Sequence, residues 1–145
     1  FMKTKILLIL GFLMSTIVLG APKTRFSDQQ IAAFVPKYFA RDHHAPNISR
    51  IRIYSEDGKK VFHLEIDVNR NRFEGQMDYT VSAMASLAQY AKIPFDTFIV
   101  VMHPSLRDLD SELVEANATC SINYFVRKKM DYDKWMKNCT KITPV

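Results

Sequence analysis

Three titratable side chains alternate with apolar residues in the segment HLEID, which places His63, Glu65 and Asp67 at two-residue spacing. In a β-strand such residues project from one face, about 6–7 Å apart along the strand. An imidazole beside a carboxylate can transfer protons, and His63 with Glu65 could bind a divalent cation if a neighbouring element supplied a further ligand. The alternative is a solvated hairpin face stabilised by cross-strand pairs with Arg50 and Arg52, whose charge would repel a cation. We therefore assign no metal site and keep His63 and Glu65 as its candidates.

A second group of reactive residue types follows the apolar run TFIVVMH. His103 ends this run, and Ser105 and Asp108 come soon after it, so that the three residue types of a hydrolase triad are close in sequence. The chain contains no G-x-S-x-G motif, however, and Ser105 and Asp108 could equally cap a short helix containing Leu109 and Leu113. We assign no catalytic residue, and we expect His103 to be the centre of the active site if the protein is an enzyme.

Aromatic and basic residues are interleaved near the C-terminus. The candidate binding residues are Tyr124, Arg127, Lys128, Tyr132 and Trp135. Rings beside cations can bind sugars, anionic polymers or a protein, and aromatic residues and arginine are enriched at protein interfaces. The alternative is that Trp135 and Met136 pack the last helix on a sheet while the basic residues stay solvated.

The chain contains two cysteines, Cys120 and Cys139, whose spacing matches neither a C-x-x-C motif nor a zinc knuckle. We predict that they form a disulfide, which would close a loop of about 18 residues and stabilise the fold by roughly 3 kcal/mol. Such a bond is typical of an exported protein. In a eukaryotic host, the N-x-S/T sequences at Asn47, Asn117 and Asn138 would also be glycosylation sites.

The N-terminal segment offers a route for export. Lys3 and Lys5 precede a mostly apolar run over residues 6–19, and the small residues Gly20 and Ala21 follow it. This order is typical of a signal peptide that is cleaved after Gly20. A membrane-spanning helix needs about 20 apolar residues, so this run is short for one. A retained N-terminal anchor is the alternative.

The clearest local structure is a β-hairpin in RIRIYSEDGKKVFHLEIDV. The pair Asp57–Gly58 is a strong signal for a two-residue turn. With this turn, Ile53 lies opposite Phe62 on an apolar face. Arg50 then lies opposite Glu65 on a charged face, and the coincidence of the two patterns supports this register.

The remaining elements follow from periodicity. We predict helices over residues 28–41, 74–92 and 132–139, strands over 97–103 and 118–126, and a capping box from Ser27 and Gln30 at the first helix. After the N-terminal helix the order resembles ββαββα. The sequence therefore predicts an α+β two-layer sandwich, with about four mainly antiparallel strands and helices packed on one face.

Composition limits the function further. The 145 residues are 48% hydrophobic and 24% charged, which fits a signal peptide or retained anchor over residues 1–20 and a single exported domain with one disulfide over 21–145. The net charge of +5 is not gathered into a block, so we expect no nucleic-acid partner. No glycine-rich phosphate loop is present, and we expect no organic cofactor.

These observations favour a small periplasmic or secreted binding or accessory domain that recognises a protein or a cell-envelope component. It would contact the membrane only if the N-terminal segment were retained, as a membrane-anchored accessory protein. The alternative from a different class is a small hydrolase or metal-dependent enzyme, centred on His103 or on His63 and Glu65.

Overall fold

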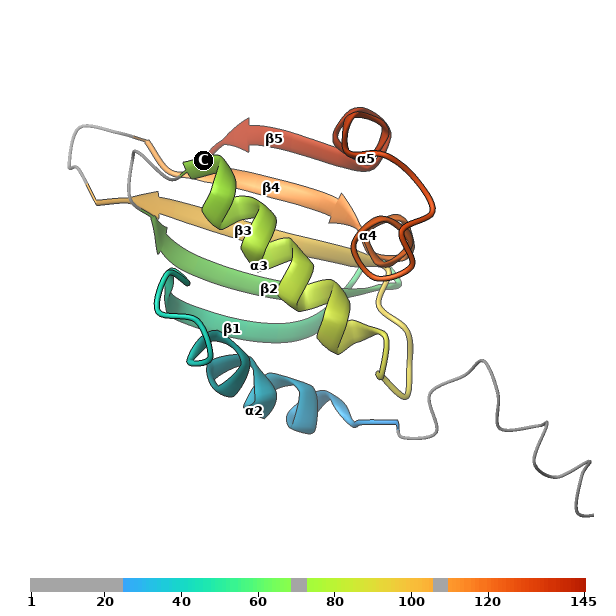
Figure 1. Ribbon diagram of the computed structural model, residues 1–145. Coiled ribbons are helices and arrows are strands. Elements are labelled where there is room, and N and C mark those ends of the chain that lie inside the picture. Colours follow the sequence, from blue (N-terminus) through green and yellow to red (C-terminus); the bar gives the residue numbers. More distant parts are fainter. Residues whose placement is uncertain (1–24, 69–72, 106–109) are drawn as a thin grey trace, which may run out of the picture.

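The computed structural model describes residues 25–68, 73–105 and 110–145, and it shows helices packed against one face of a five-stranded β-sheet (Figure 1). The helices are α2 (Asp28–Phe39), α3 (Phe73–Ala88), α4 (Ala118–Phe125) and α5 (Tyr132–Cys139). The strands are β1 (Asn47–Glu56), β2 (Lys59–Val68), β3 (Thr97–Pro104), β4 (Glu112–Asn117) and β5 (Thr140–Pro144). The predicted signal peptide lies outside the described residues, among which no helix is long and apolar enough to cross a membrane.

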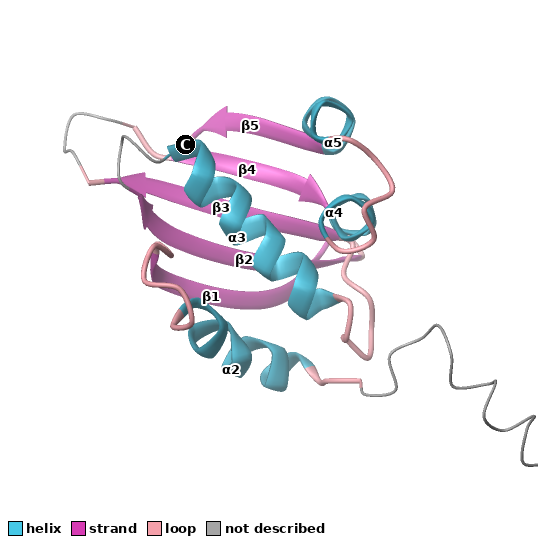
Figure 2. Cartoon of the chain, viewed as in Figure 1, coloured by secondary structure: helices cyan, strands magenta, loops and turns pink. Residues whose placement is uncertain are grey.

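The strands follow their chain order across the sheet, β1-β2-β3-β4-β5 (Figure 2). All neighbouring pairs are antiparallel except β2 and β3, which are parallel. Parallel neighbours need a crossover connection, and α3 lies between these two strands in the chain and crosses the sheet (Figure 1). The predicted α+β class with helices on one face is confirmed. The sheet is mixed, however, and the described residues form five strands rather than about four.

The β1–β2 hairpin has the predicted turn and register. Asp57 and Gly58 both have positive φ angles, 53° and 77°, as a tight two-residue turn requires. Ile53 lies opposite Phe62, and the pairing continues along both strands to a register shift between Ile48 and Arg50. The hairpin therefore separates an apolar face from a polar face over most of its length.

The core lies between the helices and the apolar face of the sheet. Phe62, Leu64 and Ile66 of β2 alternate along the strand and are fully buried. Each helix contributes buried residues to the same cluster, including Ile31 of α2, Met84 of α3, Ala118 of α4 and Trp135 of α5. One hydrophobic core therefore fixes the helices on a single side of the sheet.

The first helix has the predicted capping box but is shorter than expected. The Ser27 N–H donates to Gln30 Oε1 at 2.9 Å, and the Gln30 N–H donates to Ser27 Oγ at 3.3 Å. The helix ends at Phe39 rather than at residue 41 and contains Pro36. An ion pair of 2.6 Å between Asp28 and the mostly buried Lys60 connects α2 to β2.

The prediction of a strand over residues 118–126 was wrong, because this segment forms α4. Asn117 caps the helix, and its side-chain oxygen accepts from the Cys120 N–H at 2.8 Å. This capping interaction and core packing on the sheet outweigh the strand preference of the aromatic residues in the segment. Leu113, expected in a short helix, lies in β4 instead, while Asp108 and Leu109 lie outside the described residues.

The predicted disulfide is confirmed. Cys120 and Cys139 are bonded, with 6.1 Å between their Cα atoms, and they connect the first turn of α4 to the end of α5. The helix predicted over residues 132–139 is confirmed as α5, and it leads directly into β5. An intramolecular disulfide of this kind indicates an oxidising environment.

Candidate functional site

The face of the sheet opposite the hydrophobic core is not covered by any helix among the described residues (Figure 1). We call it the open face. Because side chains alternate along a strand, it is formed by the residues between the buried core positions. They include Arg50, Arg52 and Tyr54 of β1, His63 and Glu65 of β2, Ile99, Val101 and His103 of β3, and Leu113 of β4.

A carboxylate on the open face lies between two imidazoles. Glu65 Oε2 is 3.1 Å from His63 Nε2, two residues away on the same strand. Glu65 Oε1 is 2.9 Å from His103 Nε2. The second contact depends on the parallel pairing of β2 with β3, which places Glu65 opposite Val101 and so brings His103 to the diagonal position.

Each imidazole binds a hydroxyl group through its other nitrogen. His63 Nδ1 is 3.0 Å from the Tyr54 hydroxyl, and His103 Nδ1 is 2.8 Å from Ser111 Oγ. Tyr54 comes from β1, and Ser111 immediately precedes β4. The result is a continuous series of hydrogen bonds across the sheet, which we call the imidazole chain: Tyr54, His63, Glu65, His103 and Ser111.

The charge of Glu65 determines the direction of these hydrogen bonds. The hydrogen bond from His103 lowers the pKa of the Glu65 carboxyl group, and the hydrogen bond and charge of His63 add to this effect, although burial opposes it. The carboxylate is therefore ionised at neutral pH and can only accept hydrogen bonds. Both imidazoles must donate from Nε2, so in their neutral form both accept at Nδ1.

The hydroxyl groups at the two ends must consequently act as donors. The Tyr54 O–H donates to His63 Nδ1, and the Ser111 O–H donates to His103 Nδ1. Burial raises the pKa of Tyr54, with a further contribution from Glu56, so this hydroxyl keeps its proton at neutral pH. One carboxylate therefore orients two imidazoles and, through them, two hydroxyl groups.

The two halves of the imidazole chain differ in burial. The side chain of His63 is 10% exposed and that of Glu65 is 21% exposed, whereas that of His103 is 38% exposed. We call Tyr54 with His63 the buried arm and His103 with Ser111 the exposed arm. A ligand in solution can reach the exposed arm more readily.

Apolar and basic side chains surround the imidazole chain on the open face. Leu113 lies opposite Val101 in the β3–β4 register, and both are neighbours of the exposed arm. Val101 is buried, while Leu113 and Ile99 are half-buried. Near the buried arm, the guanidinium of Arg52 lies 4.5 Å from the centre of the Tyr54 ring.

The structure brings together candidates that the sequence presented separately. His63 and Glu65 lie in one cluster with His103, but His103 binds Glu65 and Ser111 rather than Ser105. The side chain of Ser105 is exposed, and its N–H donates to the Val68 carbonyl. The third predicted partner of His103, Asp108, lies outside the described residues.

The predicted register of the arginines is confirmed, but their expected charge pairs are not what holds Glu65. Arg50 lies opposite Glu65 and Arg52 lies opposite His63. The two oxygens of Glu65 nevertheless contact imidazoles, and Arg52 stacks on Tyr54. Both oxygens of Glu65 are therefore already hydrogen-bonded to His63 and His103 rather than paired with an arginine.

In the described part of the chain, no group of three or more His, Cys, Asp or Glu side chains is arranged to hold a metal ion. The hydrogen bonds of the imidazole chain explain why His63 and His103 do not form such a metal-binding group. Their Nε2 atoms donate to Glu65, and their Nδ1 atoms accept from hydroxyl groups at opposite ends of the chain. The nitrogen lone pairs therefore do not converge on one point.

The C-terminal aromatic residues pack inward. Trp135 is fully buried, and its indole N–H donates to Ser121 Oγ at 3.0 Å. Tyr124 stacks on Trp135 with 5.4 Å between ring centres, and the Tyr132 hydroxyl donates to Asp78. The basic residues of the same segment, Arg127 and Lys128, are exposed. The packing interpretation of this segment therefore holds, and Trp135 cannot present its ring to a partner in this structure.

The three possible glycosylation sites are all exposed. Asn47 is the first residue of β1, and Asn138 precedes Cys139 in α5. The side chain of Asn117 caps α4.

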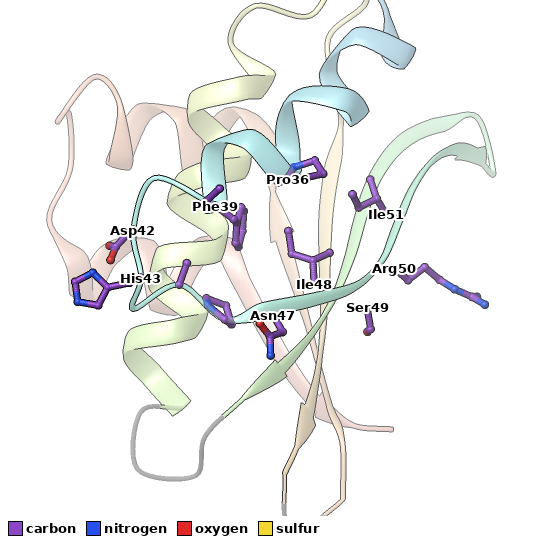
Figure 3. Close-up of a pocket in the computed structure, with 12 residues that line it drawn as sticks. Pro36, Phe39, Asp42, His43, Asn47, Ile48, Ser49, Arg50 and Ile51 are labelled. Carbon is purple, nitrogen blue, oxygen red and sulfur yellow. The ribbon is translucent and has the colours of Figure 1, made fainter.

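A groove of about 540 Å³ lies on another part of the molecule, between the end of α2 and the start of β1 (Figure 3). Phe39 and Ile48 form part of its apolar lining, and Asp42, His43 and Arg50 contribute polar groups. Arg50 lies both in the lining of this groove and on the open face. The groove contains none of the imidazole chain.

The fold and the site together define an α+β domain with one disulfide and a hydrogen-bonded pair of imidazoles on an open sheet face. The chain matches no protein-family model, and no curated protein or solved structure is significantly similar to it. The function is therefore argued from the geometry of the site.

Proposed function

We propose that this protein is an exported binding or accessory domain, periplasmic or extracellular, that recognises a protein or a cell-envelope component through the open face of its sheet. The observation that carries this proposal is the composition of that face. Half-buried Ile99 and Leu113 lie near its centre, and exposed Arg50 and Arg52 lie at its rim. Accessible apolar side chains beside the polar groups of the imidazole chain, with arginines at the rim, give the mixed composition of a protein interaction surface.

The export part of the proposal has two supports. The Cys120–Cys139 disulfide fits an oxidising compartment, and residues 3–23 have the charge and hydropathy pattern of a signal peptide. The denatured mass of the protein purified from its own compartment tests this part. We expect the mass of residues 21–145 less two hydrogens, and the full-length mass would instead favour a retained anchor.

The charge of the open face suggests the chemistry of the partner. Arg50 and Arg52 are exposed on neighbouring positions of one strand face, and guanidinium groups bind carboxylates and phosphates through paired hydrogen bonds. We therefore infer a partner that presents carboxylates or phosphates to these two arginines. The exposed residues Arg127 and Lys128 form a second basic region that could contribute to the same partner or to another.

Site-specific photo-crosslinking in the native host tests the surface. A photoreactive amino acid would be placed at Arg50 or Thr143 on the rim of the open face, at Lys128, and at the exposed residue Lys137 of α5 as a control. We expect one discrete crosslinked product from the two open-face positions and none from Lys137. A product from Lys128 alone would move the binding surface to the C-terminal basic region. Equal crosslinking at all positions would contradict a defined surface.

A further inference from the structure

We propose that Ser111 is the nucleophile of an acyl-transfer site, with His103 as its general base and Glu65 as the residue that orients His103. This activity goes beyond recognition of a partner. Its basis is the exposed arm of the imidazole chain, in which Ser111 binds His103, eight residues before it, and His103 in turn binds Glu65 on the neighbouring strand. The sequence alone suggested a different serine, Ser105, and a different acid, Asp108.

The exposed arm has the order of groups that activates a serine. The Ser111 O–H donates to His103 Nδ1 at 2.8 Å, and His103 Nε2–H donates to Glu65 Oε1 at 2.9 Å. A nucleophilic serine requires a base within hydrogen-bonding distance and a third group that orients this base. The two ring nitrogens are exchanged relative to the usual Ser-His-Asp arrangement. They are conjugated, so a carboxylate that accepts from Nε2–H can stabilise the imidazolium that forms when Nδ1 takes a proton.

Glu65 and Ser111 are both held in place by other contacts. His63 donates to the second oxygen of Glu65 and is itself bound to Tyr54, so the buried arm fixes the carboxylate. The backbone carbonyl of Ser111 accepts from the Val145 N–H at 2.9 Å. The orienting group and the base therefore lie on the adjacent strands β2 and β3, and the nucleophile immediately precedes the next strand, β4.

The reaction can be written with all atoms balanced. Ser111 Oγ attacks the carbonyl carbon of an ester while its proton moves to His103 Nδ1, and Glu65 stabilises the imidazolium that forms. The alcohol leaves with the proton from Nδ1, which gives an acyl-serine. Water attacks this acyl group, His103 again takes and returns a proton, and the carboxylic acid and free Ser111 are released.

The neighbours of the exposed arm indicate the substrate class. Leu113 follows Ser111 by two residues and therefore lies on the same face, opposite Val101. An apolar acyl group bound to the half-buried Leu113 would place its carbonyl carbon near Ser111. We therefore expect esters with short apolar acyl groups to react faster than charged or bulky polar ones.

Covalent labelling of the folded, disulfide-bonded protein tests this proposal. A fluorophosphonate would be added, the intact mass measured, and the modified residue located by peptide sequencing. We expect one adduct per chain, at Ser111, and no adduct in Ser111→Ala. Ser105→Ala is the matched control and should react at the wild-type rate, because His103 Nδ1 is hydrogen-bonded to Ser111. No labelling of the wild type, or labelling unaffected by Ser111→Ala, would overturn the proposal.

Two further variants separate a catalytic role from a structural one. His103→Gln should slow labelling and p-nitrophenyl butyrate hydrolysis about 100-fold, which is the usual contribution of a general base. Glu65→Gln should lower kcat for p-nitrophenyl butyrate with little change in KM, because the carboxylate orients the base and does not contact the ester. An unchanged kcat would remove Glu65 from the mechanism. The Ser111→Ala variant should still give the crosslinked product from position Arg50. A failure of this proposal can therefore be distinguished from a failure of the binding proposal.

Discussion

The buried and exposed arms contain the same sequence of groups but lie in different surroundings. In each arm a hydroxyl group donates to Nδ1 of an imidazole whose Nε2–H donates to Glu65. His63 is almost fully covered, and its hydroxyl partner is on a tyrosine stacked with Arg52. His103 is more exposed, and its partner is a small primary alcohol. Identical hydrogen bonding is therefore buried in one arm and accessible to solvent in the other.

The difference between the arms shows how burial changes the consequence of a hydrogen bond. Loss of a partner in a buried position leaves a polar group that water cannot reach, whereas an exposed group recovers a hydrogen bond from solvent. We therefore expect changes in the buried arm to lower the free energy of unfolding. Changes in the exposed arm should alter reactivity with little effect on stability.

The largest loss of stability is expected for Glu65→Leu. This substitution removes the acceptor that both arms share and leaves the His63 Nε2–H buried without a partner. We expect the free energy of unfolding to fall by about 1–3 kcal/mol, measured by urea denaturation. Glu65→Gln is the matched control, because its amide retains one acceptor and can also donate, and it should cost less. Equal losses of stability in the two variants would mean that the hydrogen bonds of Glu65 do not contribute to the free energy of unfolding.

A direct comparison of the arms comes from His63→Leu and His103→Leu. The first removes a mostly buried imidazole, and with it the acceptor of the half-buried Tyr54 hydroxyl, and should lower the free energy of unfolding by about 1–3 kcal/mol. The second lies at a more exposed position and should change it by about 0.5 kcal/mol or less. Thermal denaturation of both variants checks which one loses more stability. A larger loss of stability for His103→Leu would reverse the assignment of the two arms.

A smaller effect on the free energy of unfolding is expected from lowering the pH. The folded-state pKa of Glu65 is lowered from its ordinary value of 4.5, so its contribution to stability is fully present above that pH and is lost as the pH falls through the lowered pKa. Urea denaturation between pH 6 and pH 3 should show a steeper loss of stability for the wild type than for Glu65→Gln. Parallel curves would indicate that Glu65 does not titrate differently in the folded state.

Local signals predicted a large part of the fold. The Asp57–Gly58 turn, the capping box at Ser27 and the disulfide each depend on a few residues with strong preferences, and each is present in the structure. The segment that forms α4 contains both a capping asparagine and strand-favouring residues, and tertiary packing decided between them. β5 is short and mostly exposed, so it lacks the apolar alternation that identifies a strand.

The site was only partly predictable, because it depends on a long-range pairing. The two-residue spacing of His63 and Glu65 was enough to place them on one face. Their contact with His103 requires β2 and β3 to be parallel neighbours, and no local pattern specifies that register. Ser111 was missed because the sequence suggested a short helix containing Leu109 and Leu113 around it, whereas in the structure it immediately precedes β4.

The central claim is that one carboxylate orients both imidazoles with Nε2 as the donor. The most direct measurement is a ¹⁵N NMR spectrum of the histidine side chains at pH 8, assigned with His63→Leu and His103→Leu. We predict that both His63 and His103 carry their proton on Nε2 and have an unprotonated Nδ1. A proton on Nδ1 of either ring, or rapid averaging between the two nitrogens in His63, would contradict the claim.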